Sequence, residues 1–215
     1  MPRAVSKKSE LTRDRILDAA YQLFIQKGFN ATSMREIVVQ AGITMGGIYN
    51  HFSSKEEIWI EVLLTRHPYH RILPLVRESK GRNTAELIRS AAHRLVSELD
   101  QEPDLLHLMF IEIVEFSGRH VPMIFEHAMP ELQTLAPMLA GHQEHLRKLP
   151  VSTLVRAFAG LFFSYYVTGR LVGGQTTMVF NEQVLDEFID LFLLGVLADD
   201  DPARSDLNRP AGEAA

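Results

Sequence analysis

The sequence predicts an all-α protein with three short N-terminal helices and a larger helical body, about nine helices in total. Apolar residues recur at spacings of three and four, whereas the alternating β-branched runs typical of strands do not recur. Apolar residues make up 46% of the 215 residues and charged residues 23%, which is the globular range. We divide the chain into domains at 9–54 and 55–198 and expect the polar tail, 199–215, to be disordered.

The first predicted helix begins near Ser9 or Thr12 and ends at Lys27. Gly28 follows where a left-handed C-terminal cap is favoured. Helical spacing puts one set of apolar residues on a common face, which we expect to be buried: Ile16, Ala19, Ala20, Leu23 and Phe24.

Two short helices come next. Ser33 and Glu36 form a capping-box pattern that starts a helix reaching residue 41, where Gly42 breaks it. Thr44 caps a third helix that extends to about His51.

The remaining chain predicts a longer fourth helix and five more. The fourth begins after Ser53 or Ser54, and Pro68 and Pro74 should kink or end it. The others are expected over residues 84–99, 103–116, 122–141, 151–171 and 182–198, the third of them interrupted by Pro130 and Pro137.

Charge is unevenly distributed along the chain. Residues 1–55 carry eight Lys or Arg and four Asp or Glu, a balance of +4, so a net charge of −5 leaves −9 for the rest. A basic N-terminal part on an acidic body suits a protein that presents one end to a polyanion. The alternative is a chance fluctuation on a solvated surface.

Composition also bounds location and chemistry. The chain has no cysteine, which excludes disulfides, thiolate metal sites and cysteine nucleophiles and fits a reducing cytoplasm. Residues 1–9 are polar and basic, unlike a signal peptide, and the longest apolar run, 157–167, is shorter than the roughly 18 residues of a membrane span. We expect a soluble cytoplasmic protein with no membrane contact.

The second and third helices predict a helix-turn-helix, with Gly42 in the turn. Gly46 and Gly47 weaken the third helix, each by roughly 1 kcal/mol relative to alanine. Their presence makes sense where a backbone must approach DNA closely. Hydroxyl, imidazole and ammonium groups suited to phosphate surround the pair, at Thr32, Ser33, Thr44, Tyr49, His51 and Lys55.

The stretch from Thr12 to Leu64 resembles the DNA-binding domain of the TetR (tetracycline repressor) family of bacterial regulators. The resemblance is carried by Ile16–Ala20, Lys27–Phe29, Ala31–Ile37, Ala41–Thr44 and Ile48–Tyr49, together with His51-Phe52 and Ser54–Glu56. Gly47 and Val38 depart from the usual pattern, which leaves the operator sequence open.

This resemblance implies a dimer that binds double-stranded DNA and a C-terminal domain that binds a small effector. It implies phosphate contacts from Thr32, Ser33, Tyr49, His51 and Lys55. It implies a recognition surface formed by Thr44, Met45, Gly46, Gly47 and Asn50.

The last two predicted helices have wide apolar faces, which favours a four-helix dimer interface. The residues expected there are Ala157, Gly160, Leu161, Ser164, Phe188, Phe192 and Val196. The alternative is that both helices are central core helices.

Polar groups among apolar ones in the middle helices suggest a pocket for a small, largely apolar organic effector. The candidates are His107, Phe110, Glu112, Phe116 and His127. Alternatively, Glu112 faces solvent or pairs with an arginine such as Arg119.

Two pairs of histidines, His67 with His70 and His142 with His145, raise the alternative of a metal sensor, although a metal needs three or four converging ligands. We expect no metal and no cofactor. The sequence lacks a Gly-rich phosphate loop, His-Glu-x-x-His and Gly-x-Ser-x-Gly, so we expect no enzyme.

The resulting hypothesis is a ligand-responsive repressor that binds a palindromic operator as a dimer and is released by its effector. An effector-independent DNA-binding protein is the other alternative, but it would leave the large body without a task.

Overall fold

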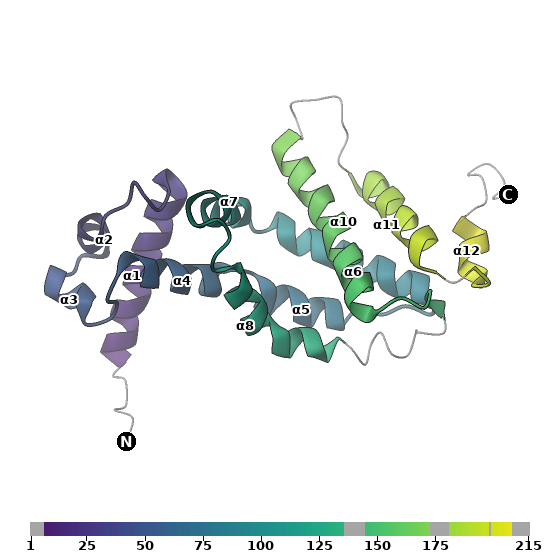
Figure 1. Ribbon diagram of the computed structural model, residues 1–215, viewed down its shortest axis with the longest axis horizontal. Coiled ribbons are helices and arrows are strands. Elements are labelled where there is room, and N and C mark those ends of the chain that lie inside the picture. Colours follow the sequence, from purple (N-terminus) through teal and green to yellow (C-terminus); the bar gives the residue numbers. More distant parts are fainter. Residues whose placement is uncertain (1–6, 136–144, 173–180, 198, 208–215) are drawn as a thin grey trace, which may run out of the picture. The chain divides into compact units, whose positions relative to one another are not determined.

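The computed structural model describes residues 7–135, 145–172, 181–197 and 199–207, and every regular element within them is a helix (Figure 1). The helices are α1 (Lys7–Lys27), α2 (Met34–Ala41), α3 (Met45–Tyr49), α4 (Lys55–Arg66), α5 (Tyr69–Arg77), α6 (Thr84–Asp100), α7 (Leu105–Phe116), α8 (Val121–Thr134), α10 (Val151–Val172), α11 (Glu182–Val196) and α12 (Pro202–Leu207). The prediction of an all-α fold is confirmed.

The contacts divide the chain into two compact units. We call residues 1–68 with 103–128 the head, and residues 69–102 with 129–215 the body. The head therefore contains α4, α7 and the first part of α8 as well as α1–α3, whereas the sequence placed everything after residue 54 in a second domain.

Local caps delimit the helices of the head as predicted. Gly28 and Gly42 follow α1 and α2 with φ of 84° and 62°, in the left-handed region that favours glycine. Ser33 accepts from the N–H of Glu36, whose carboxylate accepts in return from the N–H of Ser33, which completes the capping box. Thr44 caps α3 by a single hydrogen bond, in which its hydroxyl oxygen accepts from the N–H of Gly47.

The core of the head is built on the predicted face of α1. Ile16, Ala20 and Phe24 have no exposed surface. Phe24 also belongs to an aromatic cluster with Phe29, Trp59 of α4 and Phe116 of α7, in which the Trp59 and Phe116 rings stack at 5.6 Å between centroids. This cluster joins α7 to the N-terminal helices.

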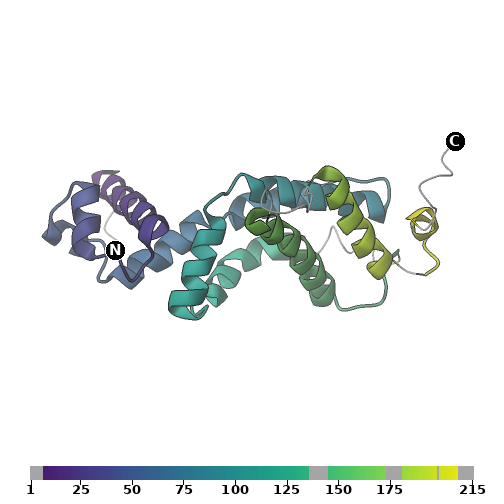
Figure 2. The ribbon, with the colours of Figure 1, turned by 90° about the horizontal axis from the view of Figure 1, so that it is seen from above.

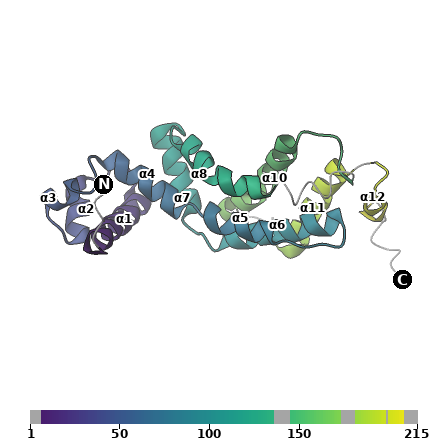
Figure 3. The same cartoon turned by 90° about the horizontal axis from the view of Figure 1, so that it is seen from below.

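In the body, α6 packs against α5, α10 and α11 (Figures 1–3). Ala92 of α6, Phe162 of α10 and Ile189 of α11 are fully buried in the shared core. Arg89 of α6 bridges Asp186 and Asp190 of α11, at 2.7 and 2.5 Å, and so fixes the two helices at the surface.

Two expectations about the C-terminal half are corrected. Helix α8 ends at Thr134 with Pro130 inside it, whereas we expected it to reach residue 141; residues 136–144, including Pro137, lie outside the described part. The expected disordered tail contains α12, because the buried carboxylate of Asp201 accepts from the N–H of Ala203 and caps its first turn. Residues 208–215 lie outside the described part.

Substituting Gly81 with alanine should destabilise the body. A Cβ atom there would lie 2.2 Å from the backbone N of Leu87 and 2.6 Å from the carbonyl C of Glu86, so the start of α6 must shift. Forced overpacking of this kind costs about 1–3 kcal/mol. Urea unfolding at a fixed protein concentration measures the loss.

Gly46→Ala is the matched control, because a Cβ atom on Gly46 has nothing within 4 Å. Equal unfolding midpoints for both variants and the parent would contradict the tight approach of Gly81 to α6.

Candidate nucleic-acid interface and ligand pocket

Helices α2 and α3 are joined by a tight turn at Gly42. The N–H of Ile43 donates to Val38 (3.2 Å), and the guanidinium of Arg15 binds the carbonyls of Ala41 and Gly42 from the side of α1. Ile48 of α3 has no exposed surface, so it anchors the helix to the head core. This is the geometry of a helix-turn-helix.

The outer face of α3 is open. Met45 is 41% and Tyr49 55% exposed, and Gly46 and Asn50 also lie on the surface. The side chain of Thr44 is exposed as well, while its hydroxyl accepts from the N–H of Gly47 (3.1 Å). Side chains and backbone of α3 are therefore accessible from outside the head.

Three residues predicted to contact phosphate have roles inside the head. Thr32 is 2% exposed, and its hydroxyl donates to the carbonyl of Gly28 (2.8 Å). Ser33 is exposed, but its hydroxyl serves the cap of α2. The ammonium of Lys55 donates to the carbonyls of Phe29 and Thr32 and lies 4.1 Å above the Phe29 ring, and partial burial lowers the pKa of Lys55.

Other cations of the head also have internal partners. Arg13 pairs with Glu61 (2.8 Å) and donates to the carbonyl of His51 (3.2 Å), which is itself half-buried. Lys27 pairs with Glu36 and, with Ser33, lowers the pKa of that carboxyl to about 2. Arg35, at the start of α2, is exposed.

Helix α7 holds the loop between α1 and α2 through Glu115. Its carboxylate accepts from the N–H of Phe29 (3.0 Å) and the N–H of Asn30 (2.6 Å). The same carboxylate explains Gly28, since a Cβ atom there would lie 2.6 Å from Glu115 Oε1. Two side chains thus fix the loop that leads into the helix-turn-helix. Glu115 binds its backbone N–H groups, and Lys55 binds its backbone carbonyls.

One turn earlier, Glu112 is fully buried and hydrogen-bonded. It accepts from Trp59 Nε1 (2.8 Å) and from the backbone N–H of His120 (2.7 Å), and it lies 3.0 Å from His120 Nδ1. His120 Nε2 lies 3.2 Å from Glu56, which also pairs with Arg119. A buried carboxylate thereby links α4, α7 and the turn that begins α8.

The five predicted effector residues all belong to the head, and none of them lines the pocket that the structure shows in the body. Glu112 lies in this polar network and Phe116 in the aromatic cluster, whereas His107, Phe110 and His127 are exposed. Glu112 pairs with a tryptophan and a histidine, where we had considered solvent or an arginine.

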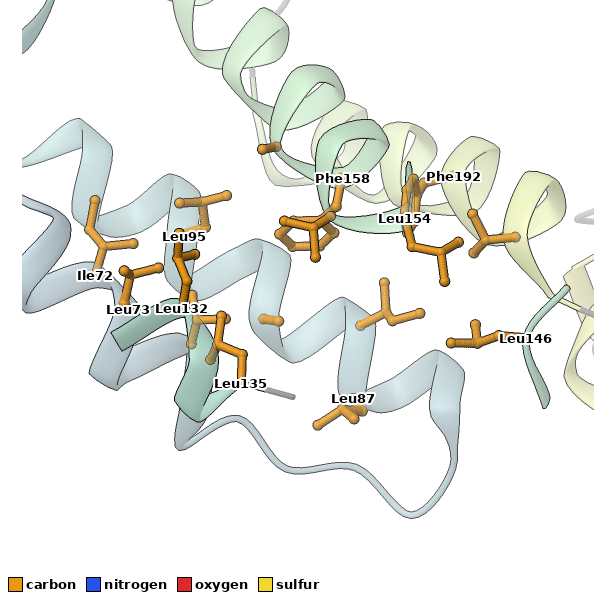
Figure 4. A pocket seen from close by; sticks show the side chains of 16 residues that line it. Ile72, Leu73, Leu87, Leu95, Leu132, Leu135, Leu146, Leu154, Phe158 and Phe192 are labelled. Atoms are coloured by element: carbon orange, nitrogen blue, oxygen red, sulfur yellow. The ribbon is translucent and has the colours of Figure 1, made fainter. Parts of the chain in front are cut away.

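The body contains an apolar pocket of about 180 Å³ instead. Sixteen side chains line it, from α5, α6, α8, α10 and α11 and from residues 135 and 146, and each of them is Ala, Val, Leu, Ile or Phe (Figure 4). Leu87 and Ala91 come from α6, Leu132 from α8 and Phe158 from α10. The apolar spacing of Ile72 and Val76 is a signal for it in the sequence, whereas polar residues among apolar ones are not.

The predicted dimer residues divide into two groups. Ala157, Gly160 and Ser164 are exposed along one face of α10, with Leu161 and Phe188 half-buried beside them. Phe192 and Val196 are 8% and 5% exposed and belong to the core. Leu191, which is 65% exposed, and Gly195 complete a shallow apolar groove along α10 and α11.

The histidine pairs show no metal site. Among the residues that the structure describes, no three His, Asp or Glu side chains are grouped to hold an ion; His142 lies outside them. Within the same residues, no helix is both long and apolar enough to cross a membrane.

Comparisons with known proteins agree with the helix-turn-helix. The profile of the family described as "Bacterial regulatory proteins, tetR family" matches residues 16–62. The HTH-type transcriptional regulator YvkB of Bacillus subtilis is 25% identical over 194 residues, covering 87% of this chain and 98% of its own length. The HTH-type transcriptional repressor BepR of Brucella suis is 29% identical over 117 residues, covering 53% and 56%.

The fold also has relatives among solved structures. A Mesorhizobium loti protein described as a TetR-family transcriptional regulator aligns with a TM-score of 0.65 at 21% identity. The alignment covers 90% of this chain and all of the other, so the likeness extends over both units.

Replacing Glu112 with alanine should strongly destabilise the head. The N–H groups of Trp59 and His120 would lose their acceptor in a buried site, and removing one partner of a buried polar pair costs about 3–5 kcal/mol. Urea unfolding followed by the fluorescence of Trp59, the single tryptophan of the chain, measures it.

Glu126→Ala, at an exposed position of α8, is the control and should change stability by less than about 0.5 kcal/mol. If Glu112→Ala were as mild as this control, the buried network would not be what fixes α4 to α7.

Proposed function

Because the chain is a TetR-family helix-turn-helix transcriptional regulator, a family of regulators and not of enzymes, we propose that it is a ligand-responsive repressor. It binds a palindromic operator as a homodimer in the cytoplasm and leaves the operator when a small, largely apolar molecule occupies the body. The repressor assignment is supported by BepR, whose name describes it as a repressor.

The observation that carries the DNA-binding part is the open face of α3. Met45, Tyr49 and Asn50 are exposed, and Gly46 leaves the helix backbone uncovered between them. An exposed glycine in a five-residue helix costs stability, so its presence calls for a close neighbour that the head itself does not provide. The floor of a DNA groove supplies such a neighbour.

Dimerisation is supported by the groove along α10 and α11. Gly160 and Gly195 have open space above them, so another helix can approach both backbones closely. Exposed Leu191 gives this groove an apolar character that water does not favour. A two-fold dimer would place two copies of α3 at half-sites roughly 34–36 Å apart.

The apolar pocket supports an effector. The apolar side chains that line the pocket lack close packing partners on that side, which stabilises the body less than a filled interior would. A body selected for stability alone would be filled. This argues against an effector-independent DNA-binding protein, and the absence of a grouped ligand set in the described residues gives no support to a metal sensor.

Helices that line the pocket are continuous in the chain with helices of the head, so ligand binding can affect DNA binding. Ile72 and Val76 of α5 line the pocket, and α5 follows α4 with only His67 and Pro68 between them. Leu132 of α8 lines it too, and α8 begins at the turn whose His120 binds Glu112. A ligand that binds one arrangement of α5 and α8 more tightly would favour that arrangement. Its effect on the conformational equilibrium of the head is limited by the difference between its affinities for the two arrangements.

Gly46→Ala should weaken DNA binding while leaving the fold intact. A methyl group has space in the free protein and favours a helix by up to about 1 kcal/mol, but it would stand between α3 and the DNA. We expect affinity for an operator selected in vitro to fall roughly tenfold, or about 1.4 kcal/mol, by fluorescence anisotropy at fixed salt.

Ser97→Ala, on the exposed side of α6, makes a similar helix-favouring change away from α3 and should bind as the parent does. Unchanged affinity of the Gly46 variant would rule out close approach of α3 to DNA.

Gly160→Glu should convert the dimer to a monomer. The side chain has room in a single subunit, but it would place a charge in the apolar interface. Sedimentation velocity should show half the mass, and affinity for a full palindrome should fall toward that for a half-site. Ser97→Glu adds the same charge elsewhere on the body; if both variants stay dimeric, the α10–α11 face is not the interface.

A further inference from the structure

The pocket of the body limits what its ligand can be. None of the sixteen described side chains that line it carries a nitrogen, oxygen or sulfur atom (Figure 4). The described side chains of the wall therefore offer a ligand neither a hydrogen-bond donor nor an acceptor nor a charge.

We infer that the pocket takes a neutral hydrocarbon without hydrogen-bonding groups, of the size of a single alkyl-substituted ring. This inference rests on the proposed effector role of the pocket and names the chemical class of its ligand.

The volume of the pocket indicates the size of ligand that it holds. An engineered protein cavity of about 150 Å³ lined by Leu, Ile and Phe stays dry and binds benzene. The pocket here has about 180 Å³ and the same kind of lining, so it fits a ring with one or a few added carbons. Water is a poor occupant, because a buried water needs two to four polar partners.

Polarity sets the selectivity. A hydroxyl group carried into the pocket gives up its hydrogen bonds to water and finds no described replacement, which should weaken binding at least roughly tenfold. An ammonium or carboxylate would be excluded, because it would give up its hydration and the described lining side chains offer neither a charge nor a hydrogen bond in return.

Substitutions at two of the lining residues should change the pocket volume in opposite directions. Ala91 of α6 is 4% exposed and projects no more than a methyl group, so Ala91→Leu fills the space. Phe158 of α10 supplies a ring to the wall, so Phe158→Leu enlarges the space.

The test titrates the full chain, without DNA, with toluene, phenol, benzylammonium and butylbenzene, using ligand-observed NMR and calorimetry. We expect saturable toluene binding, phenol at least tenfold weaker, and no benzylammonium binding. Ala91→Leu should abolish toluene binding, and Phe158→Leu should gain affinity for butylbenzene relative to toluene. Ile113→Ala, an exposed apolar position of the head, should bind as the parent does.

Phenol or benzylammonium binding as tightly as toluene would overturn the inference. So would full toluene affinity in an Ala91→Leu protein with parental circular dichroism and melting temperature. If that variant does not fold, an unchanged butylbenzene-to-toluene ratio in Phe158→Leu overturns it equally.

Operator release, measured separately, distinguishes this inference from the proposed function. Toluene that binds without releasing DNA upholds the ligand class and contradicts the switch. Release of DNA by a polar compound, with no hydrocarbon bound in the pocket, upholds the switch and contradicts the ligand class.

Discussion

The head depends on keeping one buried carboxylate satisfied. Glu112 has no exposed surface, so its oxygens must find donors inside the protein, and they find them on Trp59 and His120. These donors come from α4 and from the turn before α8. The network therefore forms only when α4, α7 and this turn are correctly placed relative to one another. Glu115, one turn later, extends the same constraint to the loop before α2. The open face of α3 is thus presented by a rigid support.

The interior of the head is filled, whereas the interior of the body contains a pocket. Around Glu112, polar groups and the rings of Trp59 and Phe116 fill the interior, so the position of each helix is specified. Around the pocket, the described side chains of the body leave a volume of about 180 Å³ unfilled. A filled head favours one arrangement of the helix-turn-helix, while an unfilled body is the part whose helices gain most from a bound molecule. The division of roles follows from packing before any function is invoked.

What the sequence predicted well was local, and what it missed was assembled from distant segments. The caps at Ser33, Thr44 and Ser54 depend on groups three residues away, so the pattern alone locates them. Glu112 was correctly singled out as a costly carboxylate, but its partner Trp59 lies 53 residues away and the pairing has no local signature. The pocket forms only where five helices converge. The apolar periodicity of each helix in the sequence is the same whether its apolar side chains pack against a neighbouring helix or line a pocket.

Several basic residues of the N-terminal segment bind partners within the head. Arg15 and Lys55 bind carbonyl groups, which are neutral, so both keep their net positive charge while losing freedom to reach a phosphate directly. Arg13 and Lys27 pair with carboxylates and are largely compensated. Charges held within about 8–10 Å of the surface still attract a polyanion at physiological salt. We therefore propose that the cations shape the helix-turn-helix and steer DNA toward it, and that exposed groups such as Tyr49, Asn50 and the backbone at Gly46 make the contacts.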